Sequence, residues 1–196
     1  GDLFQRDSWI YAHVERSEAW ELAPSVKLDS DHAERLGSLQ WADAPEVEAS
    51  HWDEWILAMT LWMRPAFGAS DGAALLRRCA QWHFDSLCGE NHLLQFVQAT
   101  VAVEILLGDK ASSDVIGLGE LLANRCAYSL ARNAAERTQL LSEFKQIYET
   151  RSQIVHRGKP DLSESETEQL WRLKNLERKL IRNEIDLMSG RRHTQR

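Results

Sequence analysis

The feature that most constrains this chain is a series of five segments with the apolar spacing of amphipathic helices, separated by short stretches that carry helix stop and start signals. Gly108 ends one segment, Gly158 and Pro160 end another, and the capping-box pattern Ser163-Glu-Ser-Glu166 opens the last. Because short connections join amphipathic helices to antiparallel neighbours, the sequence predicts an all-α antiparallel bundle. The predicted helices cover residues 72–87, 91–107, 118–131, 135–155 and 163–188.

Residues 1–68 differ from the bundle in composition. They hold six of the eight tryptophans and contain 5 Lys and Arg against 13 Asp and Glu. Alternation over residues 9–14 is typical of a strand, the apolar spacing indicates a helix over 46–63, and a boundary is expected between Pro65 and Gly72. The tryptophans favour a core or an interface, with base stacking as the alternative. We therefore predict a Trp-rich acidic extension over residues 1–68, a helical bundle over 69–189 and a frayed tail over 190–196.

The charge of the chain restricts its partners. The formal net charge is −7, which argues against a surface that coats a DNA duplex non-specifically. Residues 143–196 contain 12 Lys and Arg against 9 Asp and Glu, whereas residues 1–142 contain 11 against 21. Any contact with nucleic acid is therefore expected to be local and to involve the C-terminal part.

Cysteine usage and hydropathy indicate a cytoplasmic protein without a membrane partner. Cys79, Cys88 and Cys126 are an odd number, which we interpret as reduced thiols. No apolar run approaches the roughly 20 residues that cross a bilayer, and no secretion signal opens the chain. The chain begins Gly1-Asp2 rather than with methionine, which is compatible with an upstream domain or a partner protein.

One helix of the bundle ends in residues that can act on a phosphodiester. Arg151 continues the apolar stripe of the predicted helix, and Tyr148, Ser152 and His156 form the adjacent row. Arg157 and Lys159 follow directly and are candidate substrate-binding residues. An arginine fork matches phosphate oxygens, and a histidine can gain or lose a proton near neutral pH.

This set of groups predicts cleavage of RNA without a metal or cofactor. The 2′-OH of RNA is its own nucleophile, so His156 can accept its proton or protonate the leaving 5′-oxygen, while Arg151 stabilises the charged phosphorane. The expected product is a 2′,3′-cyclic phosphate. The spacing of Arg151 and His156 has an alternative interpretation, a structural arginine followed by a C-terminal helix cap.

The order of several sequence blocks resembles the HEPN superfamily, in particular its Apea-like branch. The most specific block is Tyr-x2-Arg-Ser-x2-Val-His-x-Gly, from Tyr148 to Gly158, and the resemblance extends over about residues 71–188. Many members of the superfamily have Asn or Asp after the motif arginine, whereas this chain has Ser152. The supporting blocks are Leu76-Arg-Arg-Cys-Ala-Gln-Trp-His-Phe84, residues 93–108 and Gly119-Glu-Leu-Leu-Ala-Asn-Arg125-Cys-Ala-Tyr128.

The resemblance implies a HEPN-type bundle that forms a homodimer, in which the motifs of two copies meet in a cleft that cleaves RNA. It assigns Arg151 and His156 the catalytic roles, and it implies a place in bacterial antiphage defence, toxin or RNA-processing systems. The alternative is a non-catalytic module of the same fold that dimerises, binds a nucleotide or docks a partner protein.

Further polar residues have supporting or structural interpretations. Glu104 and Arg125 are expected to pair within the bundle or to position Arg151, with a structural ion pair as the favoured account. Tyr148 is expected to pack with a polar tip. The residues Cys79, His83, Cys88 and His92 have zinc-ligand chemistry, but their spacing matches no compact zinc motif, so no metal site is expected.

Overall fold

The computed structural model describes the backbone of residues 8–10, 13–16, 19–22 and 26–28, and residues 30–38, 51–108 and 117–190 in full. The chain forms two compact units. One consists of residues 1–44 with 87–89, and the other of residues 45–86 with 90–196.

The first unit contains short strands and one helix. Strand β1 (Ser8–Ile10) pairs antiparallel with β4 (Val26–Leu28), and β2 (His13–Arg16) pairs antiparallel with β3 (Ala19–Leu22). Helix α1 covers Ser30–Gly37. The alternation over residues 9–14 therefore did indicate extended backbone, in two strands rather than one, and residues 11 and 12 lie outside the described part.

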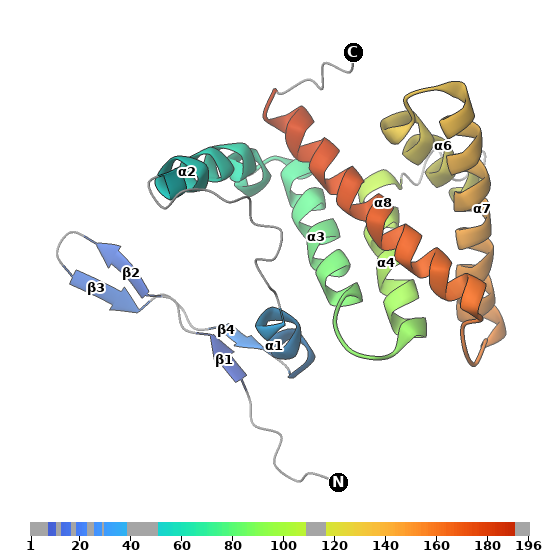
Figure 1. Cartoon of the computed structure of the whole chain (residues 1–196), viewed down its shortest axis with the longest axis horizontal. Coiled ribbons are helices and arrows are strands. Elements are labelled where there is room, and N and C mark those ends of the chain that lie inside the picture. The colour runs from blue at the N-terminus through green and yellow to red at the C-terminus, as the bar shows by residue number, and fades with distance from the viewer. Residues whose placement is uncertain are drawn as a thin grey trace, which may run out of the picture. The chain divides into compact units, whose positions relative to one another are not determined.

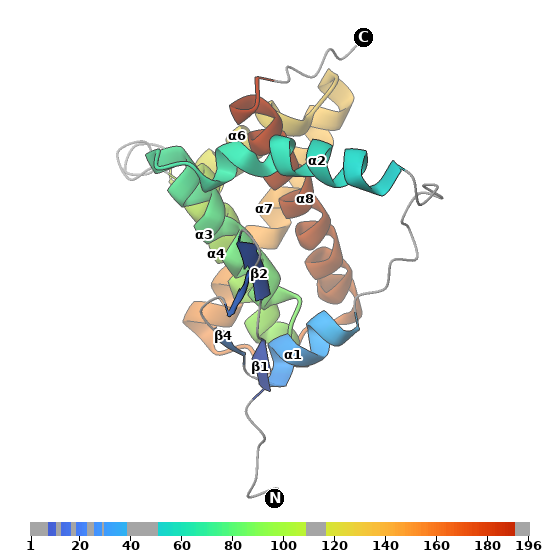
Figure 2. The ribbon, with the colours of Figure 1, turned by 90° about the vertical axis from the view of Figure 1, so that its left-hand side faces the viewer.

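The second unit is the helical bundle, and the all-α prediction is confirmed for it. Helix α8 contacts α3, α4, α6 and α7, as Figures 1 and 2 show. Each of the five predicted helices is present, with ends within about two residues of the predicted ones. The elements are α2 (Trp52–Met63), the 3₁₀ turn η2 (Arg64–Phe67), α3 (Asp71–Ser86), α4 (His92–Leu107), α6 (Leu118–Leu130), α7 (Ala134–Arg157) and α8 (Glu164–Met188).

Side-chain caps explain why the helix ends were predictable. Asn91 and Asn133 accept hydrogen bonds from the backbone at the starts of α4 and α7. Ser163 and Glu166 form the complete capping box of α8. Gly158 ends α7 with a φ of 62°, a left-handed conformation that favours glycine.

The core lies between α4, α6, α7 and α8. The buried face of α4 passes through Phe96, Ala99 and Val103. The sequence spacing places Leu93, Val97 and Val101 on one apolar stripe, but in the structure Val97 and Val101 are half-buried. The spacing also places Leu121, Arg125 and Tyr128 on one stripe of α6, of which Leu121 is buried and Tyr128 is 84% exposed. On α7 the predicted stripe is confirmed by Phe144 and Ile147. The largest buried side chains of this core include Phe96, Leu122, Phe144, Ile147, Leu170, Leu173 and Leu180.

The division of the chain falls at Ala44/Pro45, not between Pro65 and Gly72 as predicted. Helix α2 belongs with the bundle because the indole Nε1 of Trp62 donates a 2.6 Å hydrogen bond to Oδ1 of Asp186 in α8. Trp62 also packs against a small apolar cluster of Ala66, Leu76 and Ile185. Residues 46–50 of the predicted helix and 191–196 of the predicted tail lie outside the described residues.

None of the helices in the described part combines the length and apolar character that a membrane crossing requires.

Candidate functional site

Arg151 lies on the inner side of α7 near the end of the helix. It follows Phe144 and Ile147 on the buried stripe, and its side chain is 18% exposed. A guanidinium group at such a position needs a charged or polar partner, because an unpaired charge there is costly. The structure supplies that partner from α4.

The partner is Glu104. Its Oε1 atom lies 3.3 Å from Nε of Arg151, and its side chain is 19% exposed. Both atoms are shielded from solvent, and among the described residues neither has a partner with hydrogen-bond geometry, so the contact is an ion pair. Burial raises the pKa of the Glu104 carboxyl, and the charge of Arg151 acts in the opposite direction. The structure pairs Glu104 with Arg151, an arrangement compatible with both predicted roles of Glu104, the structural ion pair and the positioning of Arg151.

Tyr148 is the second residue that contacts Arg151. The guanidinium carbon lies 5.7 Å from the centre of the Tyr148 ring, within the range of a cation–π contact. Gly119 of α6 also lies against this ring, where an added Cβ would lie 2.6 Å from Cδ1 of Tyr148. Burial raises the pKa of the Tyr148 hydroxyl, Glu104 acts in the same direction, and Arg151 acts in the opposite one. The packing role predicted for Tyr148 agrees with these contacts.

His156 lies on the outside of the same helix end. His156 and Arg157 are exposed, Ser152 is half-buried, and Val155 is 45% exposed. Five residues of α-helix separate Arg151 from His156, which corresponds to about 140° around the axis and about 7.5 Å along it. The two residues therefore start from different faces of α7.

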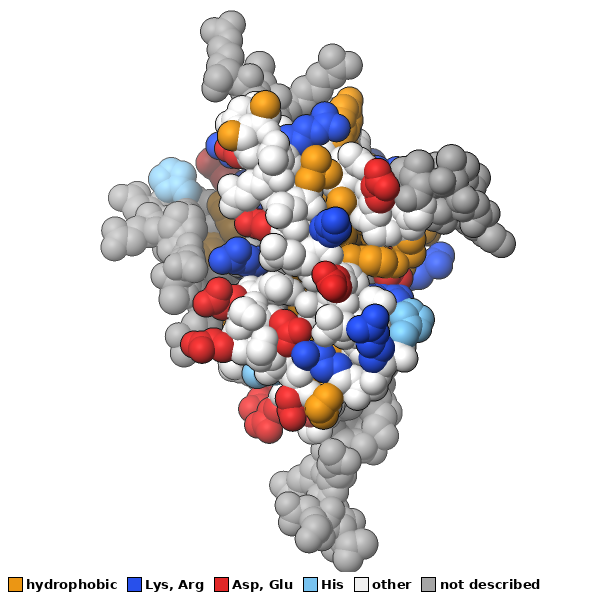
Figure 3. All heavy atoms as spheres, turned by 90° about the vertical axis from the view of Figure 1, so that its right-hand side faces the viewer, with side chains coloured by type: hydrophobic (Ala, Val, Ile, Leu, Met, Phe, Trp, Pro, Cys, Tyr) orange, Lys and Arg blue, Asp and Glu red, His pale blue; other side chains and the backbone are white. Residues whose placement is uncertain are grey.

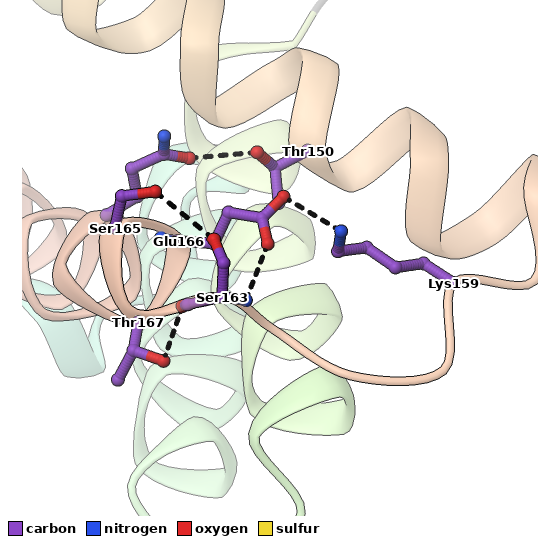
Figure 4. Close-up of polar contacts among 7 residues, drawn as sticks. Thr150, Lys159, Ser163, Ser165, Glu166 and Thr167 are labelled. Carbon is purple, nitrogen blue, oxygen red and sulfur yellow. Dashed lines mark hydrogen bonds and ion pairs between the residues drawn. The ribbon is translucent and has the colours of Figure 1, made fainter.

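Lys159 is held within the turn that joins α7 to α8. Its Nζ lies 3.1 Å from Oε1 of Glu166, and Glu166 also accepts a hydrogen bond from the backbone N–H of Ser163 (Figure 4). Thr150 of α7 donates a 2.9 Å hydrogen bond to Gln169 of α8 beside this turn. These contacts join the end of α7 to the start of α8. They also engage Lys159, a candidate substrate-binding residue of the sequence analysis, with Glu166.

Arg125 supports the bundle from α6. Its Nη1 donates a 2.8 Å hydrogen bond to the carbonyl of Leu107, at the C-terminal end of α4. A cation at that position satisfies a terminal carbonyl and favours the negative end of the helix dipole. Arg125 thereby stabilises the end of the helix that carries Glu104.

A buried polar network that sequence reasoning missed lies between α3, α4 and α8. Nδ1 of His83 is hydrogen-bonded to Oε2 of Glu177, whose side chain is fully buried. Nζ of Lys174 donates a 2.9 Å hydrogen bond to Oε1 of Gln95 and lies over the ring of Trp171. The available signal was the position of Lys174 and Glu177 on the face of α8 that also carries Leu170 and Leu173, where only apolar residues are expected.

This network also accounts for part of the zinc pattern. His83 is engaged by Glu177, and burial raises the pKa of the Cys79 thiol to about 12, with Glu177 and Glu184 acting in the same direction. Burial likewise raises the pKa of Cys126 to about 12. Within the fully described ranges, no three His, Cys, Asp or Glu side chains gather as a metal site would require. Cys79, Cys88 and Cys126 are buried thiols.

An open hollow of about 650 Å³ lies at the other end of α7, between that helix, α6 and α8. It is lined by the basic residues Arg132, Lys179 and Arg182 and by the acidic residues Glu136 and Glu143. Figure 3 shows the face over α6 and α7, on which basic and acidic side chains are interspersed.

Comparison with known proteins gave no match among family models, curated proteins or solved structures. The residues with the chemistry for a functional site lie at the end of α7. They offer a positioned guanidinium group and an exposed imidazole, which together can stabilise charge on a phosphate and move a proton.

Proposed function

We propose that this protein is a metal-independent endoribonuclease of the HEPN type that acts as a pair of copies in the bacterial cytoplasm, in a defence or toxin-like system. The observation that carries the proposal is the arrangement at the end of α7. Arg151 is held by Glu104 and Tyr148, and the exposed His156 follows it by five residues. A positioned guanidinium group and an exposed imidazole on one helix end suit phosphodiester cleavage.

The chemistry uses the 2′-hydroxyl of RNA as the nucleophile. His156 accepts the 2′-OH proton, the 2′-oxygen attacks phosphorus, and the bond from phosphorus to the 5′-oxygen breaks. The 5′-oxygen leaves with the proton that His156 took from the 2′-OH. Arg151 stabilises the additional negative charge on the phosphorane oxygens. The products are a 2′,3′-cyclic phosphate and a free 5′-hydroxyl.

The pairing of two copies follows from the geometry of one helix. Arg151 and His156 are separated by about 140° around α7, so one copy does not easily place both against the same phosphate. A two-fold axis beside the end of α7 would bring the Arg151 of one copy toward the His156 of the other.

We propose that Glu104 positions Arg151 and leaves the terminal nitrogens of Arg151 able to bind a phosphate. The ion pair is formed through Nε of Arg151. An arginine has four further N–H donors on its two terminal nitrogens, and these can contact two phosphate oxygens at once.

The test is cleavage of total RNA by the purified protein in EDTA, followed by analysis of the termini. We expect cleavage with 2′,3′-cyclic phosphate ends, and a loss of about 100-fold or more in Arg151→Ala and in His156→Ala, because each removes a group that acts in the transition state. The matched control is Arg137→Ala, which removes an exposed arginine of the same helix. Cleavage that stops in EDTA, or that persists unchanged in both motif variants, contradicts the proposal.

One observation favours a second candidate function, a non-catalytic module that binds a phosphate or a partner. The ion pair with Glu104 satisfies Arg151 within its own chain, as expected for a structural residue. On this reading the protein binds RNA or a nucleotide with an affinity that depends on Arg151, and its purified form leaves RNA intact under all metal conditions.

A further inference from the structure

Helix α2 has apolar residues on two faces, one half-buried and one exposed. Trp52, Trp55, Met59 and Trp62 recur at helical spacing and are half-buried, so they form the inner face. No residue of α2 is fully buried. The opposite face carries Ile56, Leu57 and Leu61, which are 52%, 59% and 52% exposed.

An exposed apolar helix face of this kind usually marks a contact with another molecule. A surface helix of a globular protein normally turns charged and polar residues outward, and a helix that is apolar all round is normally buried. Met63 and Phe67 extend the exposed apolar area toward the end of α2 and η2, at 39% and 70% exposure.

The charges at the two ends of this face are complementary to each other. Asp53 lies at the start of α2 and Arg64 directly after its end, and both are exposed. They are eleven residues apart, which is three turns and about 20° of rotation, so they lie on almost the same line along the helix. Ile56, Leu57, Thr60 and Leu61 lie between them.

The charged and apolar residues of this outer face are arranged symmetrically about the level midway between Ala58 and Met59. A two-fold axis at that level turns a second α2 antiparallel to the first. It sets Asp53 opposite the second Arg64, Ile56 opposite the second Leu61 and Leu57 opposite the second Thr60. A parallel arrangement would instead place like charges together at both ends, which is unfavourable.

We propose that the outer face of α2 is the contact surface for α2 of a second copy of this chain, packed antiparallel. The apolar centre provides the buried contact and the Asp53–Arg64 pairs at its two ends set the direction. Antiparallel packing also aligns the opposite ends of the two helix dipoles.

This contact is separate from the pairing at the end of α7 that the proposed function uses. In Figure 1, α2 and α7 lie on opposite sides of α3 and α8, and in Figure 2 α2 lies in front of these helices and α7 behind them. A copy bound at α2 therefore leaves the end of α7 accessible. The inference goes beyond the ribonuclease proposal and stands whether or not that proposal holds.

Sedimentation velocity of the full chain tests the contact through charge reversal. Asp53→Arg sets two arginines against each other at each end, and Arg64→Asp sets two aspartates against each other. We expect each single variant to weaken self-association by about tenfold or more, and an equimolar mixture of the two to recover it, because the mixed pair restores opposite charges at both ends. The matched control is Arg137→Asp on α7, which is expected to associate as the unaltered protein does.

A second variant tests the apolar centre. Leu57→Asp is expected to abolish the contact while the helix content measured by circular dichroism stays unchanged, because the inner face of α2 is not altered. An unaltered protein that is monomeric at every concentration overturns the proposal. So does an unchanged mass in Leu57→Asp, or a mixture of the two charge-reversal variants that associates no better than either alone.

Discussion

Arg151 illustrates how a charged residue is accommodated on the buried stripe of a helix. Its neighbours on that stripe, Phe144 and Ile147, are fully buried, and the guanidinium group is satisfied by Glu104 and the face of Tyr148. Removing one partner leaves the other charge partly buried and unpaired, which costs more than the pair contributes. We therefore expect the effects of substituting Glu104 and Arg151 on the free energy of unfolding to be coupled.

A double-mutant cycle measures that coupling. Glu104→Gln keeps the size of the side chain and removes its charge, and we expect it to lower the free energy of unfolding by about 1–2 kcal/mol. When Glu104→Gln is combined with Arg151→Met, we expect a coupling energy of about 1 kcal/mol between the two substitutions, as for residues in contact. Urea unfolding gives both values, and Glu149→Gln on the exposed side of α7 is the control. Additive effects of the two substitutions would show that the ion pair does not stabilise the fold.

His83 and Glu177 form a buried pair whose neutral forms are favoured. Burial lowers the pKa of His83 to about 4, and the charges of Arg178 and Lys174 act in the same direction. Burial raises the pKa of Glu177 well above its ordinary value, and Lys174 opposes this. The two shifts act in opposite directions on the pH dependence of stability, because folding makes Glu177 bind its proton more tightly and His83 less tightly. They therefore offset each other in part in the intact pair.

Removing either partner should expose the pH dependence of the other. In Glu177→Gln the lowered pKa of His83 remains, so stability is full above pH 6.5 and is lost as the pH falls toward 4. In His83→Gln the raised pKa of Glu177 remains, so stability is lost as the pH rises above 4.5. Urea unfolding across this range should give slopes of opposite sign for the two variants. Equal slopes would contradict the neutral pair.

At the scale of elements, the approach of α6 to α7 depends on a residue without a side chain. Gly119 faces the ring of Tyr148, and a Cβ there would lie 2.6 Å from Cδ1. Tyr148 also contacts Arg151, so the same ring joins the packing of α6 to the position of the candidate site. A change in this contact is therefore expected to affect stability and the motif together.

Gly119→Ala tests this contact. Overpacking should cost about 1–3 kcal/mol, which exceeds the roughly 1 kcal/mol that alanine gains over glycine within a helix. In a Tyr148→Ala background the added methyl group has space, so the same substitution should be neutral or stabilising. Thermal or urea unfolding of the unaltered protein, the two single variants and the double variant measures both effects. A cost of the same size in both backgrounds would place the constraint elsewhere.

Helix boundaries were predictable because they depend on local chemistry. The caps at Asn91 and Ser163 and the left-handed Gly158 act within a few residues of sequence. The pairing of Arg151 with Glu104 was accessible only as one of several options, because a partner from another helix depends on how the helices pack. The buried face of α4 was misassigned for the same reason, since apolar residues occur on more than one side of that helix.

The place of α2 could not be predicted from composition. Its tryptophans and acidic residues resemble the N-terminal extension, yet Trp62 bonds to Asp186 and joins α2 to the bundle. Sequence reasoning grouped the helix with its neighbours in the chain, whereas packing groups it with α8. Of the candidate site, the motif and its helix were predictable, and the engagement of Lys159 by Glu166 was not.

Both proposals for the whole molecule involve more than one copy of the chain. A single α7 presents Arg151 and His156 on different faces, and the outer face of α2 is apolar and exposed. The two proposed contacts use different surfaces, so each copy could meet two others. Two different two-fold contacts generate either a closed assembly of four copies or an open chain.

RNA cleavage by a mixture of two inactive variants tests whether two copies share one site. Arg151→Ala and His156→Ala are each expected to be inactive alone. In a mixed pair, one site receives Arg151 from one copy and His156 from the other, so the equimolar mixture in EDTA should regain part of the cleavage rate. A mixture that exchanges subunits and yet stays as inactive as either variant alone would contradict a site shared between two copies.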